Sequence, residues 1–140
     1  MIENVDILTL IPQRPPFVLV DRILSCDEVT TVTEFKVCDG CLLQDSGILQ
    51  PWGMIENIAQ SCAARIGYRS RQAGGEVKIG VIGSVSDMAI AGLPKIGETI
   101  TTTITVLEEV LNLTLISAEI CSKVSSEILA TAKMKIALLP

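Results

Sequence analysis

One amphipathic helix pattern, set between segments that alternate like strands, constrains the fold of this chain more than any other feature. In residues 51–68 the apolar side chains recur with the spacing of a helix that buries one face, and they are Met54, Ile55, Ile58, Ala59, Cys62, Ala63 and Ile66. Pro51 suits the first turn of a helix, while Gly67 and the later Gly74–Gly75 pair are expected to end it. Because no second helix is predicted, the apolar face must be buried against a sheet.

Strand patterns surround this helix. Two precede it, at 17–20 and 28–37, and four follow it, at 77–90, 99–110, 113–123 and 128–138. Residues 40–51 are rich in turn formers and predict a loop that leads into the helix. Tight turns at Asn112 and at 124–126 favour antiparallel pairing of the last three strands. The sequence therefore predicts a single α+β domain over residues 1–140, in which an antiparallel sheet of about six strands wraps around one long central helix.

The charge pattern argues against nucleic acid as a partner. The 140 residues carry 11 Lys and Arg against 16 Asp and Glu, a net charge of −5, and no basic run is dense enough to bind a phosphate backbone. No stretch of about 18 apolar residues predicts a membrane span. Yet 49% of the residues are hydrophobic, which is more than a small monomer easily buries, and this predicts a subunit interface.

Cysteine and histidine usage limits the possible chemistry. Five cysteines, an odd number, and an N-terminal segment too acidic for a signal peptide predict reduced thiols in a cytoplasmic protein. Cys38 and Cys41 form a lone C-x-x-C, so neither a metal nor a cofactor is predicted. The sequence contains no histidine, and this excludes Ser-His-Asp and Cys-His nucleophiles. Acid–base chemistry in this chain must therefore use carboxylates.

Two segments resemble a known enzyme family. Residues 10–23, L-I-P-Q-R-P-P-F-V-L-V-D-R-I, resemble the L-P-H-R-x-P-F-L-L-V-D-R-V opening of the 3-hydroxyacyl-acyl-carrier-protein dehydratases, and residues 56–60, E-N-I-A-Q, resemble their helix motif E-A-M-A-Q. Residues 45–60 are similar to the dehydratase-like branch associated with aryl-polyene pathways. The resemblance implies a hotdog fold, in agreement with the predicted elements. It also implies that the ligand is an acyl thioester on an acyl carrier protein or on coenzyme A.

The sequence lacks one catalytic residue of that family. The dehydratases carry a histidine in a G-H-F segment before the helix, where this chain has Gly40, Cys41 and Leu42. Cys41 is therefore a candidate substrate-binding residue by position. A free thiol, with a pKa of about 8.5, is a poor replacement for the histidine base. The resemblance thus implies the fold and the ligand class more firmly than it implies dehydration.

Dehydration of a 3-hydroxyacyl thioester needs a base for the C2 proton, an acid for the leaving hydroxyl, and donors to the thioester carbonyl. By the resemblance, Glu56 is the acid, and the backbone amides of Gly53 and Met54 at the helix start bind the carbonyl oxygen. Asp45, in the preceding loop, is the candidate for the missing base, either within one chain or across a dimer interface.

Each of these residues also has a plain structural interpretation. Glu56 and Gln60 lie one helical turn apart, so they form either a surface pair or a site in which Gln60 orients a partly desolvated carboxyl. Asp45 suits a turn as well as a catalytic site. Trp52 is assigned either to the wall of an acyl tunnel or to the core.

Three functions remain open from the sequence. The first is a 3-hydroxyacyl-acyl-carrier-protein dehydratase-like lyase of fatty acid or polyene biosynthesis. The second is a thioesterase for acyl-coenzyme A or acyl carrier protein, in which the helix carboxylate activates water or attacks the carbonyl itself. The third is a non-catalytic subunit of a heteromeric dehydratase, whose partner supplies the histidine. The expected assembly is a homodimer, a heterodimer with a related hotdog subunit, or a higher oligomer.

Overall fold

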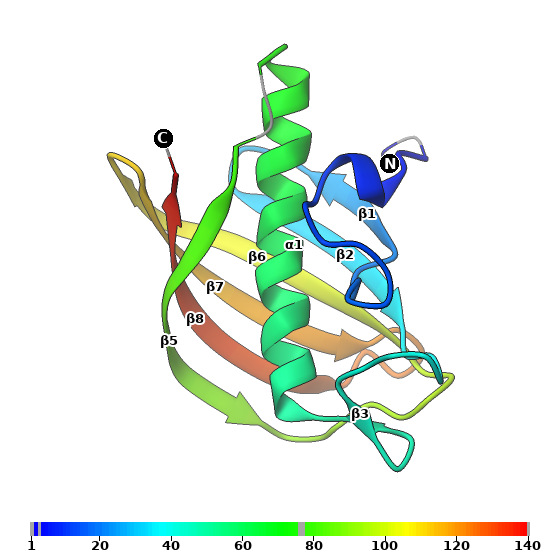
Figure 1. The fold of residues 1–140 in the computed structure, drawn as a ribbon. Helices are drawn as coiled ribbons and strands as arrows, with labels where there is room; N and C mark the ends of the chain where they lie inside the picture. The colour runs from blue at the N-terminus through cyan, green and yellow to red at the C-terminus, as the bar shows by residue number, and fades with distance from the viewer. Residues whose placement is uncertain (1, 3, 76–77, 140) are drawn as a thin grey trace.

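The computed structural model describes residues 2, 4–75 and 78–139. Its elements are η1 (Ile7–Thr9), β1 (Arg22–Cys26), β2 (Thr30–Lys36), β3 (Gln44–Asp45), β4 (Ile48–Leu49), α1 (Pro51–Gln72), β5 (Gly80–Ile90), β6 (Thr99–Val110), β7 (Leu113–Ser122) and β8 (Ile128–Leu138). Six strands form an antiparallel sheet in the order β1-β2-β6-β7-β8-β5, and β3 pairs with β4 in a separate hairpin. The sheet curves around α1 (Figure 1). The predicted hotdog architecture is therefore confirmed.

The core lies between α1 and the concave face of the sheet. Buried residues alternate with partly exposed ones along β6, as expected for a strand with one covered face. Ile100 and Ile104 of β6 meet Ile58 of α1 in this core, and all three are fully buried. Among the described residues, no helix is long and apolar enough to cross a membrane.

The prediction of a strand at 17–20 is wrong, and the strand β1 (Arg22–Cys26) was not predicted. Residues 17–20 run along α1 instead, where side chains of the helix take the place of a neighbouring strand. Leu19 donates its backbone N–H to Gln60 Oε1 at 2.7 Å and accepts from Asn57 Nδ2 at 2.7 Å. The apolar pattern marked a buried extended segment correctly, but not one with a backbone partner.

The helix is longer than the sequence indicates, because Gly67 does not end it. A side-chain carbon at Gly67 would collide with the backbone carbonyl of Leu10. The glycine therefore allows the N-terminal segment to pack closely on the helix, which continues to Gln72. Residues 40–51 were expected to form a loop, yet they contain the β3–β4 hairpin. The first residue of the strand predicted at 77–90 lies outside the described residues.

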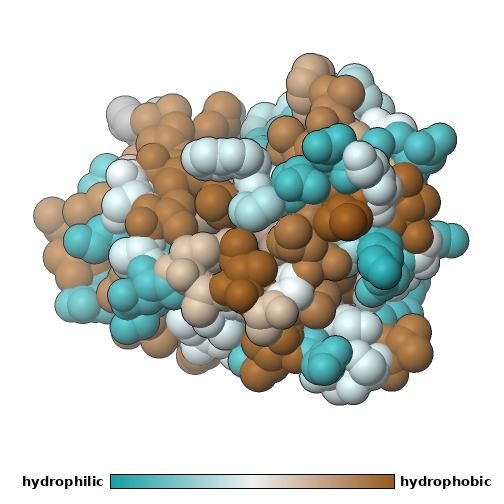
Figure 2. Space-filling model, turned by 90° about the horizontal axis from the view of Figure 1, so that it is seen from below, coloured by the Kyte–Doolittle hydropathy of each residue, from teal (hydrophilic) through white to brown (hydrophobic). Residues whose placement is uncertain are grey.

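Exposed apolar side chains accompany β5 and the start of α1. β5 is an edge strand of the sheet, and its Val81, Ile82 and Ile90 are 41–42% exposed. Figure 2 shows hydrophobic residues on the end of the molecule from which α1 begins, and Trp52 in the first turn is 73% exposed. An exposed apolar edge of this kind is typical of a surface that pairs with another chain.

Candidate active site

Three long-range hydrogen bonds join the two segments that carry the family resemblance. Gln60 donates from Nε2 to the Phe17 carbonyl at 2.7 Å, in addition to accepting from Leu19. Asn57, besides its bond to Leu19, accepts from Thr102 Oγ1 at 2.5 Å. The side-chain amides of Asn57 and Gln60 thus pair the backbone N–H and carbonyl groups of residues 17–19, which have no neighbouring strand. The two segments therefore form one structural unit.

Glu56 lies at the edge of this unit, partly exposed. Gln60 Nε2 donates to Glu56 Oε1 at 2.9 Å, and Oε2 has no hydrogen-bond partner among the described residues. Glu56 lines a pocket of about 190 Å³ between α1, the Pro12–Gln13 segment and the start of β5. The contact between Glu56 and Gln60 that the helical spacing predicts is therefore present. Their roles in catalysis stay a prediction.

Gln13 is a further polar residue in the wall of the Glu56 pocket. Its Oε1 is buried and has no hydrogen-bond partner among the residues that the structure describes. Arg14 holds the segment in place, since its guanidinium donates to the carbonyls of Ile11 and Gln13 at 2.9 and 2.7 Å. The sequence analysis did not single out Gln13. Its place beside Arg14, within the segment that resembles the dehydratases, was the available signal.

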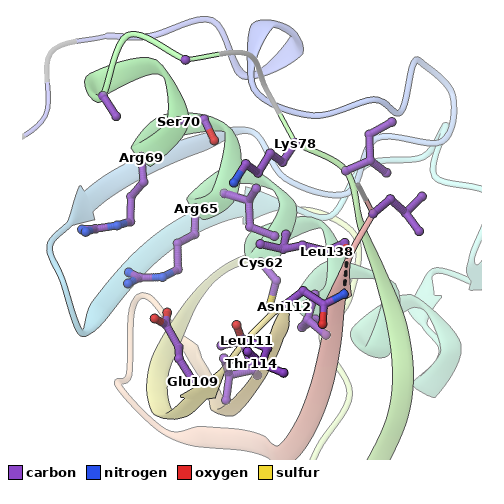
Figure 3. A pocket seen from close by; sticks show the side chains of 17 residues that line it. Cys62, Arg65, Arg69, Ser70, Lys78, Glu109, Leu111, Asn112, Thr114 and Leu138 are labelled. Carbon is purple, nitrogen blue, oxygen red and sulfur yellow. Dashed lines mark hydrogen bonds between the residues drawn. The ribbon is translucent and has the colours of Figure 1, made fainter.

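A larger groove of about 1320 Å³ continues from the Glu56 pocket along α1. The two share five lining residues: Cys62, Ile66, Lys78, Ile79 and Ile136. Figure 3 shows the labelled Arg69 and Lys78 at one end of the groove and Cys62 deeper in it. Burial raises the pKa of the Cys62 thiol to about 12, so Cys62 is a neutral part of the wall at physiological pH. A ligand that reaches Glu56 thus lies in a pocket that Lys78 also lines, and it has room to extend along the groove towards Arg69.

The helix start differs from the expected carbonyl-binding site. The backbone amides of Gly53 and Met54 both donate to the Gln50 carbonyl, at 2.9 and 3.1 Å, so neither is free for a ligand in this structure. The Trp52 amide, in the same turn, has no partner among the described residues. The alternative that placed the Trp52 side chain in the core is wrong, because it is largely exposed.

Neither Asp45 nor Cys41 reaches the Glu56 pocket within one chain. Asp45 is exposed in β3, where Ser46 Oγ donates to its Oδ1 at 3.3 Å. Cys41 is buried in the core, and burial raises the pKa of its thiol. Neither residue lines this pocket or the larger groove. Asp45 therefore remains a candidate base only across an interface.

Comparisons with known proteins identify the family and the fold of the chain. The profile of the ApeP-like family, described as ApeP dehydratase, matches residues 5–138, although no curated protein sequence matches the chain. The dehydratase heterocomplex ApeI:P from Xenorhabdus doucetiae is similar in structure, with a TM-score of 0.89 and 17% identity over 99% of this chain and 93% of that chain.

More distant structures share the fold. A hypothetical thioesterase with coenzyme A from Streptococcus pneumoniae TIGR4 has a TM-score of 0.68 and 12% identity, over 84% of each chain. The zebra fish thioesterase superfamily member 2 has a TM-score of 0.66 and 21% identity, over 86% of this chain and 81% of that chain. These similarities show the hotdog fold, while the profile match over nearly the whole length shows that the chain belongs to the ApeP-like dehydratase family.

Proposed function

We propose that this chain is one subunit of a dehydratase for 3-hydroxyacyl thioesters, with Glu56 as the acid and with the base supplied by a second hotdog subunit. The observation that carries the proposal is the composition of the Glu56 pocket. Glu56 is the sole carboxylic acid among the described residues that line it, and a lysine is the one other titratable group besides a buried thiol. Elimination of water needs both an acid and a base, so this pocket supplies half of the required pair.

The hydrogen bond from Gln60 suits Glu56 to the role of acid. Because Gln60 Nε2 donates to Oε1, Oε2 is left to carry the acidic proton. In the proposed reaction the base removes the C2 proton of the thioester, the C2–C3 double bond forms, and the C3–O bond breaks. The proton of Glu56 passes to the departing hydroxyl, which leaves as water, and Glu56 is then a carboxylate.

The position of the pocket supports a second subunit as the source of the base. Ile79, Gly80 and Ile82, at and just before the start of the edge strand β5, form one wall. A chain that pairs along the exposed edge of β5 would therefore lie beside Glu56. A similar structure was solved as a dehydratase heterocomplex, which favours a different chain as the partner. In a homodimer of this histidine-free chain, Asp45 would have to act as the base.

The larger groove supports a carrier-bound thioester as the substrate. It is continuous with the Glu56 pocket, shares Lys78 with it, and leads on towards Arg69. Two cations along a mainly apolar groove suit a ligand that has an apolar chain and a phosphate. Coenzyme A and the prosthetic arm of an acyl carrier protein both present such a group, and we propose one of them as the carrier.

The test uses the full chain purified together with the partner that accompanies it, its mass defining the assembly. With 3-hydroxyoctanoyl-coenzyme A as substrate, we expect enoyl product, and we expect Glu56→Gln to lower kcat by about 10²-fold or more. Glu127→Gln, in an exposed turn, is the matched control and should retain full activity. Gln at position 56 can still accept from Gln60, so the variant should fold.

Each alternative function has its own outcome in this assay. Enoyl formation that survives Glu56→Gln would show that Glu56 is not the acid. Release of free thiol without enoyl product would indicate the thioesterase instead. Activity of the pure homodimer that disappears in Asp45→Asn would place the base in this chain and contradict the heteromeric site.

A further inference from the structure

Cationic side chains of this acidic chain are concentrated at the end of α1. The chain has a net charge of −5, yet residues 61–75 contain three arginines and no acidic residue, and Lys78 follows before β5. Arg65 is buried, and its guanidinium is bound by backbone carbonyls of the β1–β2 turn. Arg69 and Lys78 form no ion pair among the described residues, and Glu109 is the one acid that lines the same groove in the described part of the chain. The charges of Arg69 and Lys78 are therefore available to a partner.

Exposed aliphatic side chains accompany these cations along the groove. Ile79, Leu111 and Leu139 line the groove together with Arg69 and Lys78, and they are 50%, 99% and 46% exposed. Figure 3 shows Leu111 and Lys78 on facing sides of the groove. We call these five residues the groove rim. It combines positive charge with apolar surface, a pairing that suits a partner with acidic and apolar side chains.

Leu111 is the member of the groove rim that the fold explains least. It lies at the tip of the β6–β7 hairpin, next to the paired Val110 and Leu113, and its φ is 56°. A leucine is strained in this left-handed conformation, and asparagine or glycine is usual in such a turn. Because its side chain is almost fully exposed, it adds almost nothing to the packing of this chain. A strained and exposed leucine of this kind points to contact with another molecule.

The position of the groove rim narrows the identity of that molecule. The groove continues into the Glu56 pocket through lining residues that the two share, so an occupant of the rim can deliver a thioester to Glu56. Coenzyme A could pair its phosphates with Arg69 and Lys78, but a small ligand inside the groove leaves the hairpin tip uncovered. A protein helix with acidic and apolar side chains would contact the cations and Leu111 together. A carrier protein presents such a surface beside its pantetheine arm.

We infer that the substrate reaches this subunit on an acyl carrier protein, which docks on the groove rim through a helix that bears acidic and apolar side chains. This inference rests on the proposed dehydration. Acidic side chains of the carrier pair with Arg69 and Lys78, and an apolar side chain packs on Leu111. The pantetheine arm follows the groove and brings the acyl chain to Glu56. The groove rim thus selects the carrier, while the Glu56 pocket acts on the chain.

The test compares two non-reacting ligands on the full chain in its native assembly. One is the amide analogue of 3-hydroxyoctanoyl-pantetheine, and the other is the same group on the arm of an acyl carrier protein of the source organism. We expect the loaded carrier protein to bind about tenfold more tightly, with an affinity that falls as the ionic strength rises from about 0.05 to about 0.3 M.

Charge reversal on the two sides of α1 locates the docking surface. Arg69→Glu should weaken binding of the loaded carrier protein about tenfold or more and change the affinity for the pantetheine analogue less than about twofold. Arg71→Glu makes the same change in net charge on the other side of the helix, where Arg71 donates to Thr9 Oγ1. This matched control should weaken carrier binding less than about threefold, since solvent and salt screen a distant charge.

Leu111→Asn separates docking from stability. Because asparagine suits the left-handed conformation, Tm should rise by a few degrees or less, roughly, whereas the affinity for the loaded carrier protein should fall about fivefold as the apolar contact is lost. A leucine that serves only the fold would change Tm without changing this affinity. Val124→Asn is the matched control, since Val124 is 94% exposed in the turn between β7 and β8, and it should leave carrier binding unchanged.

Three results would overturn the inference. They are equal affinity of the wild type for the two ligands, equal effects of Arg69→Glu and Arg71→Glu on carrier binding, and dissociation of the assembly by Leu111→Asn, which would place the groove rim at the subunit interface. An amide analogue of the coenzyme A thioester that binds as tightly as the loaded carrier protein would also contradict it. If the assembly forms no enoyl product, the proposed dehydration fails by itself, because these affinities require no turnover.

Discussion

The two sides of α1 differ in how completely their polar groups are paired. The closed side, formed by Asn57, Gln60, Ser61 and Arg65, faces β1, β2 and residues 17–19, and its polar groups are hydrogen-bonded. The open side consists of Glu56, Ala59, Ala63 and Ile66. It faces the start of β5 and lines the Glu56 pocket. The same helix therefore anchors the fold along one side and carries Glu56 along the other.

The bonds of Arg65 show how far the closed side is saturated. Its guanidinium donates to the carbonyls of Asp27 and Glu28, at 2.8 and 2.6 Å, and to Thr31 Oγ1 at 2.7 Å. Ser61 lies one turn earlier, where its hydroxyl lies 2.7 Å from Thr33 Oγ1. Hydrogen bonds from Ser61 and Arg65 thus hold the β1–β2 hairpin against α1 over one helical turn. No comparable set of bonds joins the open side to β5 among the described residues.

Breaking the closed side should have the largest effect on stability. Asn57→Leu keeps the size of the side chain but leaves the Leu19 carbonyl and the Thr102 hydroxyl buried without a partner. We expect a loss of about 3 kcal/mol in the free energy of unfolding, measured by urea denaturation. Asn112→Leu, in an exposed turn, should cost less than about 1 kcal/mol.

A double variant separates hydrogen bonding from packing at this position. Thr102→Val removes the hydroxyl that donates a hydrogen bond to Asn57. The double variant with Asn57→Leu should therefore lose less free energy of unfolding than the sum of the two single variants. Strict additivity, or an Asn57→Leu loss below about 0.5 kcal/mol, would mean that the network contributes little. The contrast between the two sides would then rest on packing alone.

A smaller loss of stability is expected when the ion pairs of Glu34 are broken. Glu34 lies in β2, one of the strands that the closed side of α1 faces. Glu34 of β2 is buried and accepts from Arg22 Nε at 2.7 Å and from Lys123 Nζ. The Lys123 hydrogen bond is the main reason that the pKa of Glu34 lies below its usual value. Because the folded pKa is the lower one, this stabilisation is present above the unfolded pKa of about 4.3 and is lost as the pH falls through the folded pKa.

The prediction is therefore a pH-dependent difference between wild type and Glu34→Gln. We expect the variant to be less stable by about 1 kcal/mol at pH 7, since both cationic partners are half exposed. The difference should shrink below about pH 4.3. Thermal melting from pH 7 to pH 3 measures it, with Glu127→Gln as the control. A difference that is independent of pH would assign the loss to packing rather than to charge.

The sequence predicted the elements whose signals are local. The limits of β6 and β8 agree with the predicted 99–110 and 128–138, because apolar and polar residues alternate clearly there. The start of α1 followed from Pro51. The predicted end of α1 and the predicted strand at 17–20 were wrong for the same reason. Both features depend on contacts between the N-terminal segment and the helix, which are distant in sequence.

The candidate site divides in the same way. Glu56 and Gln60 could be paired from the sequence because a helix brings residues four apart together. Gln13 could not be placed beside Glu56, since only the folded N-terminal segment brings it to the pocket. The amides of Gly53 and Met54 were expected to be free, but the tight first turn directs both to Gln50. Helix propensity predicts where a helix starts, but not which backbone amides of its first turn donate within that turn.

The smallest effect on stability should come from filling the open side. Ala59 lies on the wall of the Glu56 pocket, where three additional carbon atoms can enter a space of about 190 Å³. Leucine is a good helix former, so Ala59→Leu should change the free energy of unfolding by less than about 1 kcal/mol. The non-reacting amide analogue of 3-hydroxyoctanoyl-pantetheine should nevertheless bind at least about tenfold more weakly, because the leucine side chain occupies the space beside Glu56.

The same substitution five residues further along, on the closed side of α1, provides the matched control. Ala64 is fully buried where the helix packs against the N-terminal segment, so Ala64→Leu must displace its neighbours and should cost about 2 kcal/mol. Urea denaturation of the two variants, side by side, compares the space on the two sides directly. If Ala59→Leu costs as much as Ala64→Leu, the open side is as tightly packed as the other. A pocket beside Glu56 would then be excluded, and so would its use by a substrate.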